Sequence, residues 1–154
     1  MDIRKFLKSF KFAFLGLKNC IKTQQNMRVH LLVGSLICYF AYFFGISKIE
    51  WAILLMVIGF VLFAECVNTA VEALGDAVTK EENLNIKIAK DVSAGAVTIS
   101  AITSLTVGIC LFADGEKIVK TVTYIFTHWQ TMVVGAVILM VNFMNFWINR
   151  KGDK

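Results

Sequence analysis

The chain has 154 residues, of which 57% are hydrophobic and 18% are charged, and it contains no proline. Its mean hydropathy is +0.67. A soluble domain of this length cannot bury so much apolar surface, and the same composition excludes a disordered chain. The net charge of +5 is accompanied by no zinc-ligand spacing and no aromatic-basic sheet pattern, which argues against a nucleic-acid partner and leaves a membrane protein.

The first 22 residues carry an amphipathic helical pattern. Seven apolar residues recur at helical spacing: Ile3, Phe6, Leu7, Phe10, Phe14, Leu17 and Ile21. Lysines occupy the other faces, and seven of the sixteen bases of the chain lie before residue 29. A helix of this kind lies in the headgroup plane with its lysines over anionic lipid, so we predict a surface helix over residues 3–22.

Four stretches are apolar enough to cross a bilayer. Residues 29–46, 92–113 and 121–149 contain no Asp, Glu, Lys or Arg, and a transmembrane helix needs about 20 apolar residues. Residues 51–64 are also uncharged but are too short alone. Because a span is predicted on each side of them and the loops between are short, we expect a helix over residues 50–77 to cross with its acidic residues at one end.

Basic residues alternate between the segments that separate the predicted spans. Seven precede the first span, one follows it, three lie in the 77–91 loop, two follow the third span and three close the chain. Because Lys and Arg concentrate in cytoplasmic segments, both termini and the 77–91 loop are predicted to be cytoplasmic. The sequence therefore predicts an all-α protein of the cell membrane, with an N-terminal surface helix and four transmembrane helices.

Three acids and two neutral polar residues gather at one end of the second span, in the segment AECVNTAVEALGDA (64–77). Glu72 and Asp76 lie about 20° to either side of Glu65 around a helix, with Asn68 and Thr69 beside them. A charge at the bilayer centre costs about 2.5–3.5 kcal/mol on insertion scales. We therefore expect these acids to have partners.

Two kinds of partner fit this acidic face. Ion pairs with other helices would hold the bundle together, but no span carries a Lys or Arg at its centre. Surplus carboxylates instead indicate a hard cation such as Mg²⁺, which takes one or two carboxylates together with substrate phosphates. Lys90, at the start of the third span, would then be free to hold a phosphate at a helix N-terminus. This combination predicts phosphoryl transfer at the cytoplasmic face, with one glutamate as the base.

The same segments match a known family. The chain resembles the small integral-membrane prokaryotic diacylglycerol kinases, and most closely their Gram-positive undecaprenol kinase branch. The resemblance covers roughly residues 4–113. It rests on five segments: FKFAFLGL (10–17), NMRVH (26–30), KIEW (48–51), AECVNTAVEALGDA (64–77) and AKDVSAGAV (89–97).

The resemblance implies a role for each matching residue. Glu65 corresponds to the catalytic base that deprotonates the lipid hydroxyl, and Glu72 to a metal ligand beside the nucleotide phosphates. Lys90 and Asp91 correspond to residues that contact ATP, with Lys90 on the phosphates. The other nucleotide or active-site contacts that the resemblance implies are Lys5, Phe12, Asn68, Asp76, Glu81, Glu82 and Asn83.

The resemblance also implies an assembly and exposes two departures. The kinase domain is expected over residues 1–113, and members of the family are homotrimers whose active sites draw on neighbouring subunits. The family usually has a metal-binding glutamate where this chain has Gln24, which offers an uncharged carbonyl oxygen to the metal, so weaker Mg²⁺ binding is expected. The predicted span over residues 121–149 is the second departure, because the common form of the family has three spans.

Three functions stay open at this point. The first is an ATP- and Mg²⁺-dependent lipid kinase, with undecaprenol as the expected substrate on the Gram-positive-type sequence and diacylglycerol as the alternative. The second is a small cation- or proton-coupled transporter that uses the intramembrane acids as its relay, although this function does not account for Lys90 and Asp91. The third is an inactive descendant of the kinase, a possibility that Gln24 raises.

Overall fold

The computed structural model describes residues 2–79 and 81–149, and every regular element within these ranges is an α-helix. The all-α prediction is thus confirmed. Lys80 and the C-terminal bases Arg150, Lys151 and Lys154, which entered the charge count, lie outside the described residues. The helices are α1 (Ile3–Thr23), α2 (Gln25–Phe44), α3 (Lys48–Val78), α4 (Leu84–Leu111), α5 (Gly115–Thr127) and α6 (Trp129–Asn149).

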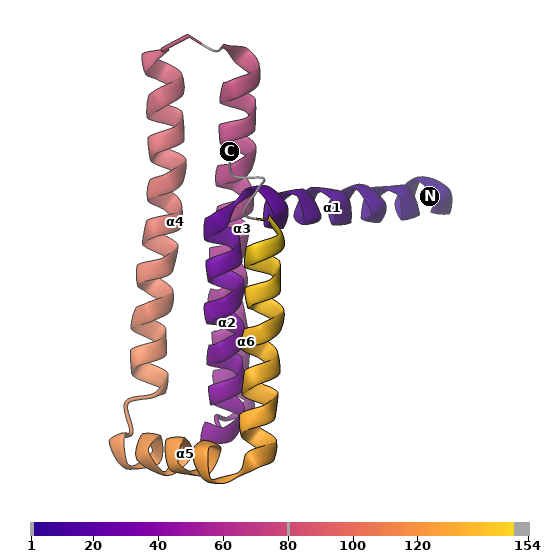
Figure 1. Ribbon diagram of the computed structural model, residues 1–154. Helices are drawn as coiled ribbons and strands as arrows, with labels where there is room; N and C mark the ends of the chain where they lie inside the picture. The colour runs from indigo at the N-terminus through magenta and orange to yellow at the C-terminus, as the bar shows by residue number, and fades with distance from the viewer. Residues whose placement is uncertain (1, 80, 150–154) are drawn as a thin grey trace.

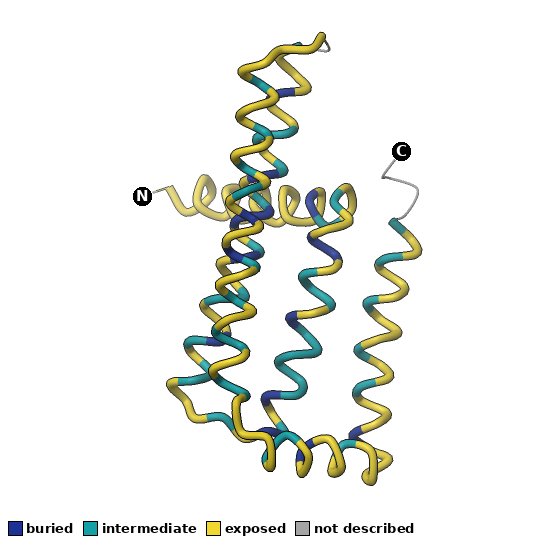
Figure 2. Tube along the Cα trace, turned by 90° about the vertical axis from the view of Figure 1, so that its left-hand side faces the viewer, coloured by how far each residue is buried: buried dark blue, intermediate teal, exposed yellow. Residues whose placement is uncertain are grey.

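Four of these helices, α2, α3, α4 and α6, are long and apolar enough to cross a membrane, and they run alongside one another (Figure 1). The prediction of four spans is confirmed. Most residues of this bundle are exposed or half-buried along its whole length (Figure 2). Many of the exposed side chains are large and hydrophobic. Apolar side chains in such numbers on the outside of a bundle are expected to face lipid.

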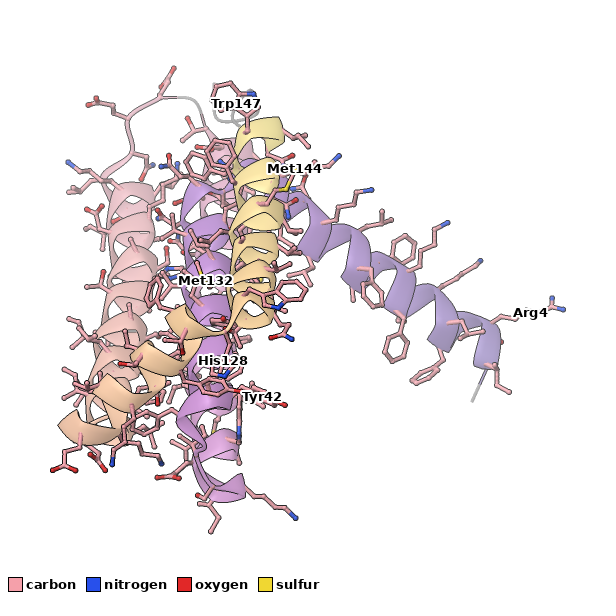
Figure 3. The ribbon with its side chains drawn as sticks, turned by 60° about the horizontal axis from the view of Figure 1, so that its bottom comes forward. Arg4, Tyr42, His128, Met132, Met144 and Trp147 are labelled. Atoms are coloured by element: carbon pink, nitrogen blue, oxygen red, sulfur yellow. The ribbon has the colours of Figure 1, made fainter. Side chains whose placement is uncertain are left out.

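The surface helix α1 lies almost at right angles to the spans and extends away from them (Figure 1). It covers nearly the residues predicted, and Arg4 marks its free end in Figure 3. Between α1 and α2 the chain turns at Gln24, whose backbone is extended at φ −107° and ψ 117°. We call the turn formed by residues 21–28 the elbow.

The helices α3 and α4 are longer than a bilayer requires. At 1.5 Å per residue, the 31 residues of α3 and the 28 residues of α4 correspond to about 46 Å and 42 Å, against a hydrocarbon thickness of about 30 Å. Their connected ends extend well past the level of α1 (Figure 1). If α1 marks the membrane surface, then the α3–α4 connection projects into water.

The C-terminal part differs from the single long span expected over residues 121–149. Residues 115–127 form α5, which lies across the ends of the spans at the side opposite α1, and only α6 runs alongside the bundle (Figure 1). The chain turns at His128, whose backbone is extended at φ −106° and ψ 111°. One side of α5 carries Val119, Val122 and Phe126, which are exposed, and the other side is polar, as in a helix that lies in a membrane interface.

Candidate active site

The acids of α3 lie in three different environments along one helix. Glu65 is 1% exposed, and neither of its carboxylate oxygens has a hydrogen-bond partner among the described residues. Glu72, two turns further on, is half-buried, and Asp76 is exposed. The exposure of the predicted acidic face therefore increases along α3, from the buried carboxylate of Glu65 to the exposed one of Asp76.

The contact between α1 and α3 sets the depth of each acid. Cys20 in the last turn of α1 has its Sγ atom 3.2 Å from Oγ1 of Thr69, so Thr69 is level with the surface helix. Along the axis of α3, Glu65 is then about 6 Å to the membrane side of this level, and Glu72 is about 4.5 Å to the other side. The two glutamates therefore lie on opposite sides of the level of the surface helix.

Both oxygens of the Glu72 carboxylate accept hydrogen bonds from side-chain amides. Asn68 donates from Nδ2 to Oε1 at 3.0 Å, and Gln24 donates from Nε2 to Oε2 at 3.2 Å. The hydroxyl of Ser93 on α4 donates in turn to Oδ1 of Asn68 at 2.7 Å. This network joins the elbow, α3 and α4, and it fixes the position of Glu72.

Lys90 is not free, contrary to the expectation from sequence. Its Nζ atom lies 2.5 Å from Oδ1 of Asp76 and forms an ion pair between α4 and α3. Gly75 allows this contact, because a Cβ atom there would lie 2.8 Å from Cε of Lys90 and 2.9 Å from Cγ2 of Ile86. The structural ion pair that the sequence left as an alternative is therefore present at this position.

A cavity of about 950 Å³ opens beside this ion pair, where α3 and α4 project past the surface helix. It brings together six of the residues expected to contact the nucleotide: Asp76, Glu81, Glu82, Asn83, Lys90 and Asp91. Asn83 also starts α4, since its Oδ1 accepts the backbone N–H groups of Asn85 and Ile86 at 3.0 and 3.3 Å. A volume of this size is in the range of small-molecule sites.

Lys5 and Phe12 are not brought to this cavity. Both lie on exposed positions of α1, which extends away from the bundle (Figure 1), and neither lines the cavity. Within one chain, neither residue therefore lies at the cavity that the other expected nucleotide contacts line.

The residues expected to hold a metal fit a hard cation in their chemistry. Among the described residues no three His, Cys, Asp or Glu side chains are grouped closely enough to hold a metal ion by themselves. Glu72 offers carboxylate oxygens and Gln24 lies beside it, with its Nε2 toward Glu72, so that a turn of the amide would bring its oxygen to the same place; the two oxygens of Glu65 are buried without a partner among the described residues. Mg²⁺ commonly takes only one or two carboxylates and completes its shell with water and phosphate.

Two residues of the site were not singled out in the sequence. Ser93 and Gly75 lie within the segments AKDVSAGAV and AECVNTAVEALGDA, but neither of them was assigned a role of its own from the sequence. Ser93 follows Lys90 by three residues, so the helical period puts the two on neighbouring positions of one face of α4. That spacing was the available signal for Ser93. A glycine inside a helix that faces another helix was the signal for Gly75.

Comparison with known proteins assigns this arrangement to a family. The sequence profile described as prokaryotic diacylglycerol kinase matches residues 11–112. The chain belongs to this family. It is 32% identical to the undecaprenol kinase of Bacillus subtilis strain 168 over 111 residues, which cover 72% of this chain and 90% of that protein. No solved structure matches the chain.

A second relative extends the comparison. The chain is 35% identical to the diacylglycerol kinase of Synechocystis strain PCC 6803 over 106 residues, which cover 68% of this chain and 61% of that protein. The names of the family and of both relatives indicate lipid kinase activity, so the resemblance and the enzyme class inferred from sequence are confirmed. The family match ends at residue 112 and leaves α5 and α6 outside it.

Proposed function

We propose that this protein transfers the γ-phosphate of ATP to the hydroxyl of undecaprenol, with diacylglycerol as the alternative acceptor. The observation that carries the proposal is the depth of the two glutamates: Glu65 is buried just inside the level of the surface helix, and Glu72 lies just outside it. A lipid hydroxyl approaches such a site from the membrane, and a nucleotide approaches it from water. The preference for undecaprenol rests on the similarity to the Bacillus subtilis enzyme.

Glu65 is the proposed general base. Its carboxylate takes the proton from the lipid hydroxyl as that oxygen attacks the γ-phosphorus, and the bond from the γ-phosphorus to the bridging oxygen of ADP breaks. The products are ADP and the lipid phosphate. A base placed in this way contributes about 10²–10⁴-fold to the rate. Burial without a hydrogen-bond partner leaves both carboxylate oxygens available for the incoming hydroxyl.

The cavity between the projecting ends of α3 and α4 is the proposed nucleotide site. Lys90 and Asp91 contact ATP there, and residues 81–83 line the same cavity. Lys90 interacts with Asp76 in the free protein, so a phosphate oxygen competes with this exposed carboxylate for the ammonium group. The exchange costs little, because exposed ion pairs contribute only about 0–1 kcal/mol.

Mg²⁺ is the proposed metal, which Glu72 would hold together with the nucleotide and, once the amide of Gln24 turns from its present hydrogen bond, with the oxygen of that amide. When bound, it neutralises charge on the transferred phosphoryl group. Asn68 keeps Glu72 in place by its hydrogen bond of 3.0 Å. Because Gln24 contributes no charge, we expect the Mg²⁺ requirement to be higher than with a carboxylate at this position.

The assembly is a proposed homotrimer in the cell membrane, with both termini and the nucleotide cavity in the cytoplasm. In one chain, α1 extends away from the bundle (Figure 1), so Lys5 and Phe12 are free to contact the nucleotide of a neighbouring subunit. The number of bases before the first span supports this orientation.

The test uses the purified full chain in mixed micelles with labelled ATP, Mg²⁺ and either undecaprenol or diacylglycerol. We expect label in the lipid fraction, more with undecaprenol, and its loss by at least about 10²-fold in Glu65→Gln. The matched control is Glu116→Gln, the same change at an exposed position of α5, which should retain full activity. Label that persists in Glu65→Gln would contradict the assigned base, and no label with either lipid would contradict the proposed function.

A further inference from the structure

The last span, α6, contacts α2 at several points from one end of α2 to the other. At the end near α5, the hydroxyl of Tyr39 donates to the carbonyl of Thr131 at 2.7 Å. Further along, Nδ2 of Asn142 lies 3.3 Å from Oγ of Ser35. In Figure 3, His128 marks the beginning of α6, and Trp147 marks the end that lies beside the elbow. A helix outside the family match therefore reaches the part of the molecule where the surface helix joins the bundle.

Arg28 holds the elbow from within. Its side chain is 4% exposed, and Nη1 donates to the backbone carbonyls of Ile21 and Lys22 at 3.2 and 3.0 Å. These carbonyls belong to the last turn of α1, where a helix leaves carbonyl groups without intrahelical partners. Arg28 therefore ties the end of α1 to the first turn of α2, and Gln24 lies between the two.

Phe146 of α6 covers this arginine. The guanidinium carbon of Arg28 lies 5.5 Å from the centroid of the Phe146 ring, within the range of a cation–π contact. Phe146 is half-buried, whereas Phe143, one turn earlier on the same helix, is 64% exposed. The contact joins α6 to the residue that fixes the direction of the surface helix.

We propose that α6 is a brace for the surface helix, and that Phe146 acts through Arg28 as a positioning residue for the active site. The chain of contacts runs from Phe146 to Arg28, from Arg28 to the carbonyls at the end of α1, and from Gln24 in the elbow to Glu72 at 3.2 Å. The effect on catalysis rests on the proposed function. The effect on the structure of the elbow is independent of the proposed function.

Cys20 reports on the elbow without any enzymatic assay. It is 3% exposed because the end of α1 packs against α3. In a full chain with Cys38, Cys66 and Cys110 replaced by alanine, Cys20 is the only thiol. We expect Phe146→Leu to raise its alkylation rate by N-ethylmaleimide about three- to tenfold, the range that loss of a partly desolvated cation–π contact corresponds to. Phe146→Trp should restore the slow rate.

The matched control is Phe143→Leu, which removes an equal ring from a more exposed position on the same groove that Arg28 and Phe146 line, and should leave the rate unchanged. If Phe146→Leu does not yield folded protein, Phe146→Met carries the same expectation. The proposal that α6 is a brace would be overturned if Cys20 were alkylated at an unchanged rate in these Phe146 variants. An equal increase in Phe143→Leu would also overturn it.

Kinetics separate the brace from a merely structural role. Phe146→Leu should raise the KM for Mg·ATP several-fold more than it lowers kcat, because the contact of Gln24 with Glu72 is lost while Glu65 stays in place. A fall in kcat alone would contradict the link to the site. If the wild-type protein transfers no phosphate, the proposed function fails, but the alkylation result still decides whether α6 braces the elbow.

Discussion

The α3–α4 pair and the α2–α6 pair are two antiparallel helix pairs of one bundle that are joined in different ways. At the end that projects past the surface helix, α3 and α4 approach each other over Gly75, and polar side chains link them at successive turns. Asp76 pairs with Lys90, and Ser93 donates to Asn68. Every one of these groups belongs to the candidate site or lies against it. Displacing one of them is therefore expected to change catalysis.

The α2–α6 pair is joined by contacts that are far apart. Tyr39 and Ser35 of α2 each make one hydrogen bond to α6, and the contact of Arg28 with Phe146 lies near the elbow. Most of this interface is therefore expected to contribute to stability alone. The difference teaches that distance from the elbow, and not the number of contacts, decides which changes in α6 reach the active site.

The largest effect in this comparison is expected for Asn68→Leu. This change removes the donor to Oε1 of Glu72, which is left unsatisfied in a part-buried place, and it removes one acceptor of Ser93, which keeps its bond to the carbonyl of Lys90 at 2.9 Å. We expect kcat/KM to fall about 10–100-fold, which corresponds to the cost of such an unsatisfied group. The control is Asn145→Leu on α6, an exposed position at which activity should be retained. Equal losses in both variants would contradict the distinction between the two helix pairs.

Gly75→Ala is expected to have the next largest effect. The added methyl would lie 2.8 Å from Cε of Lys90, so Lys90 must move away from its present position. We expect the KM for ATP to rise about five- to tenfold, which corresponds to the lower part of the about 1–3 kcal/mol that overpacking of this kind costs. Gly59→Ala, in the same helix with no atom within 4 Å, is the matched control and should leave KM unchanged. If both variants have the wild-type KM, close approach at Gly75 does not position Lys90.

Several of these features could be predicted from the sequence. The 3.6-residue period alone predicts that Glu65, Asn68 and Glu72 share one side of α3, and uncharged stretches predict four spans. A break near Gln24 is also predicted, because the amphipathic pattern of α1 changes there to the apolar pattern of the first span. Family resemblance added the roles of these residues, which composition and spacing do not provide.

Other features depend on tertiary packing. The ion pair of Lys90 with Asp76 requires the close approach at Gly75; a glycine within a helix permits such an approach, but the pattern of one helix does not identify the side chain of the other helix that makes it. The predicted span includes residues 121–127, the second half of α5, because the polar side of this half carries uncharged threonines, which a search for charges does not detect. The turn at His128 has no proline or glycine to mark it.

Gln24→Glu is expected to have a smaller effect, of opposite sign. It would put a second carboxylate beside Glu72 in place of the amide that donates to it at 3.2 Å. Like charges at this separation repel each other, and a divalent cation relieves the repulsion. We expect the Mg²⁺ concentration for half-maximal activity to fall about two- to fivefold, and thermal stability in EDTA to fall as well. A Mg²⁺ requirement that stays the same or rises would contradict the placement of the metal at Glu72.

Tyr39→Phe is expected to have the smallest effect, and it tests the α2–α6 pair far from the elbow. It removes the hydrogen bond to the carbonyl of Thr131, which in membrane proteins contributes about 0.6 kcal/mol on average. We expect a loss of this size in detergent unfolding and wild-type kinase activity. Tyr42→Phe, at a position that is 72% exposed, is the control and should change neither quantity. If Tyr39→Phe instead raised the KM for Mg·ATP as much as Phe146→Leu, then α6 would act on the site as one rigid body, and distance from the elbow would no longer separate its contacts.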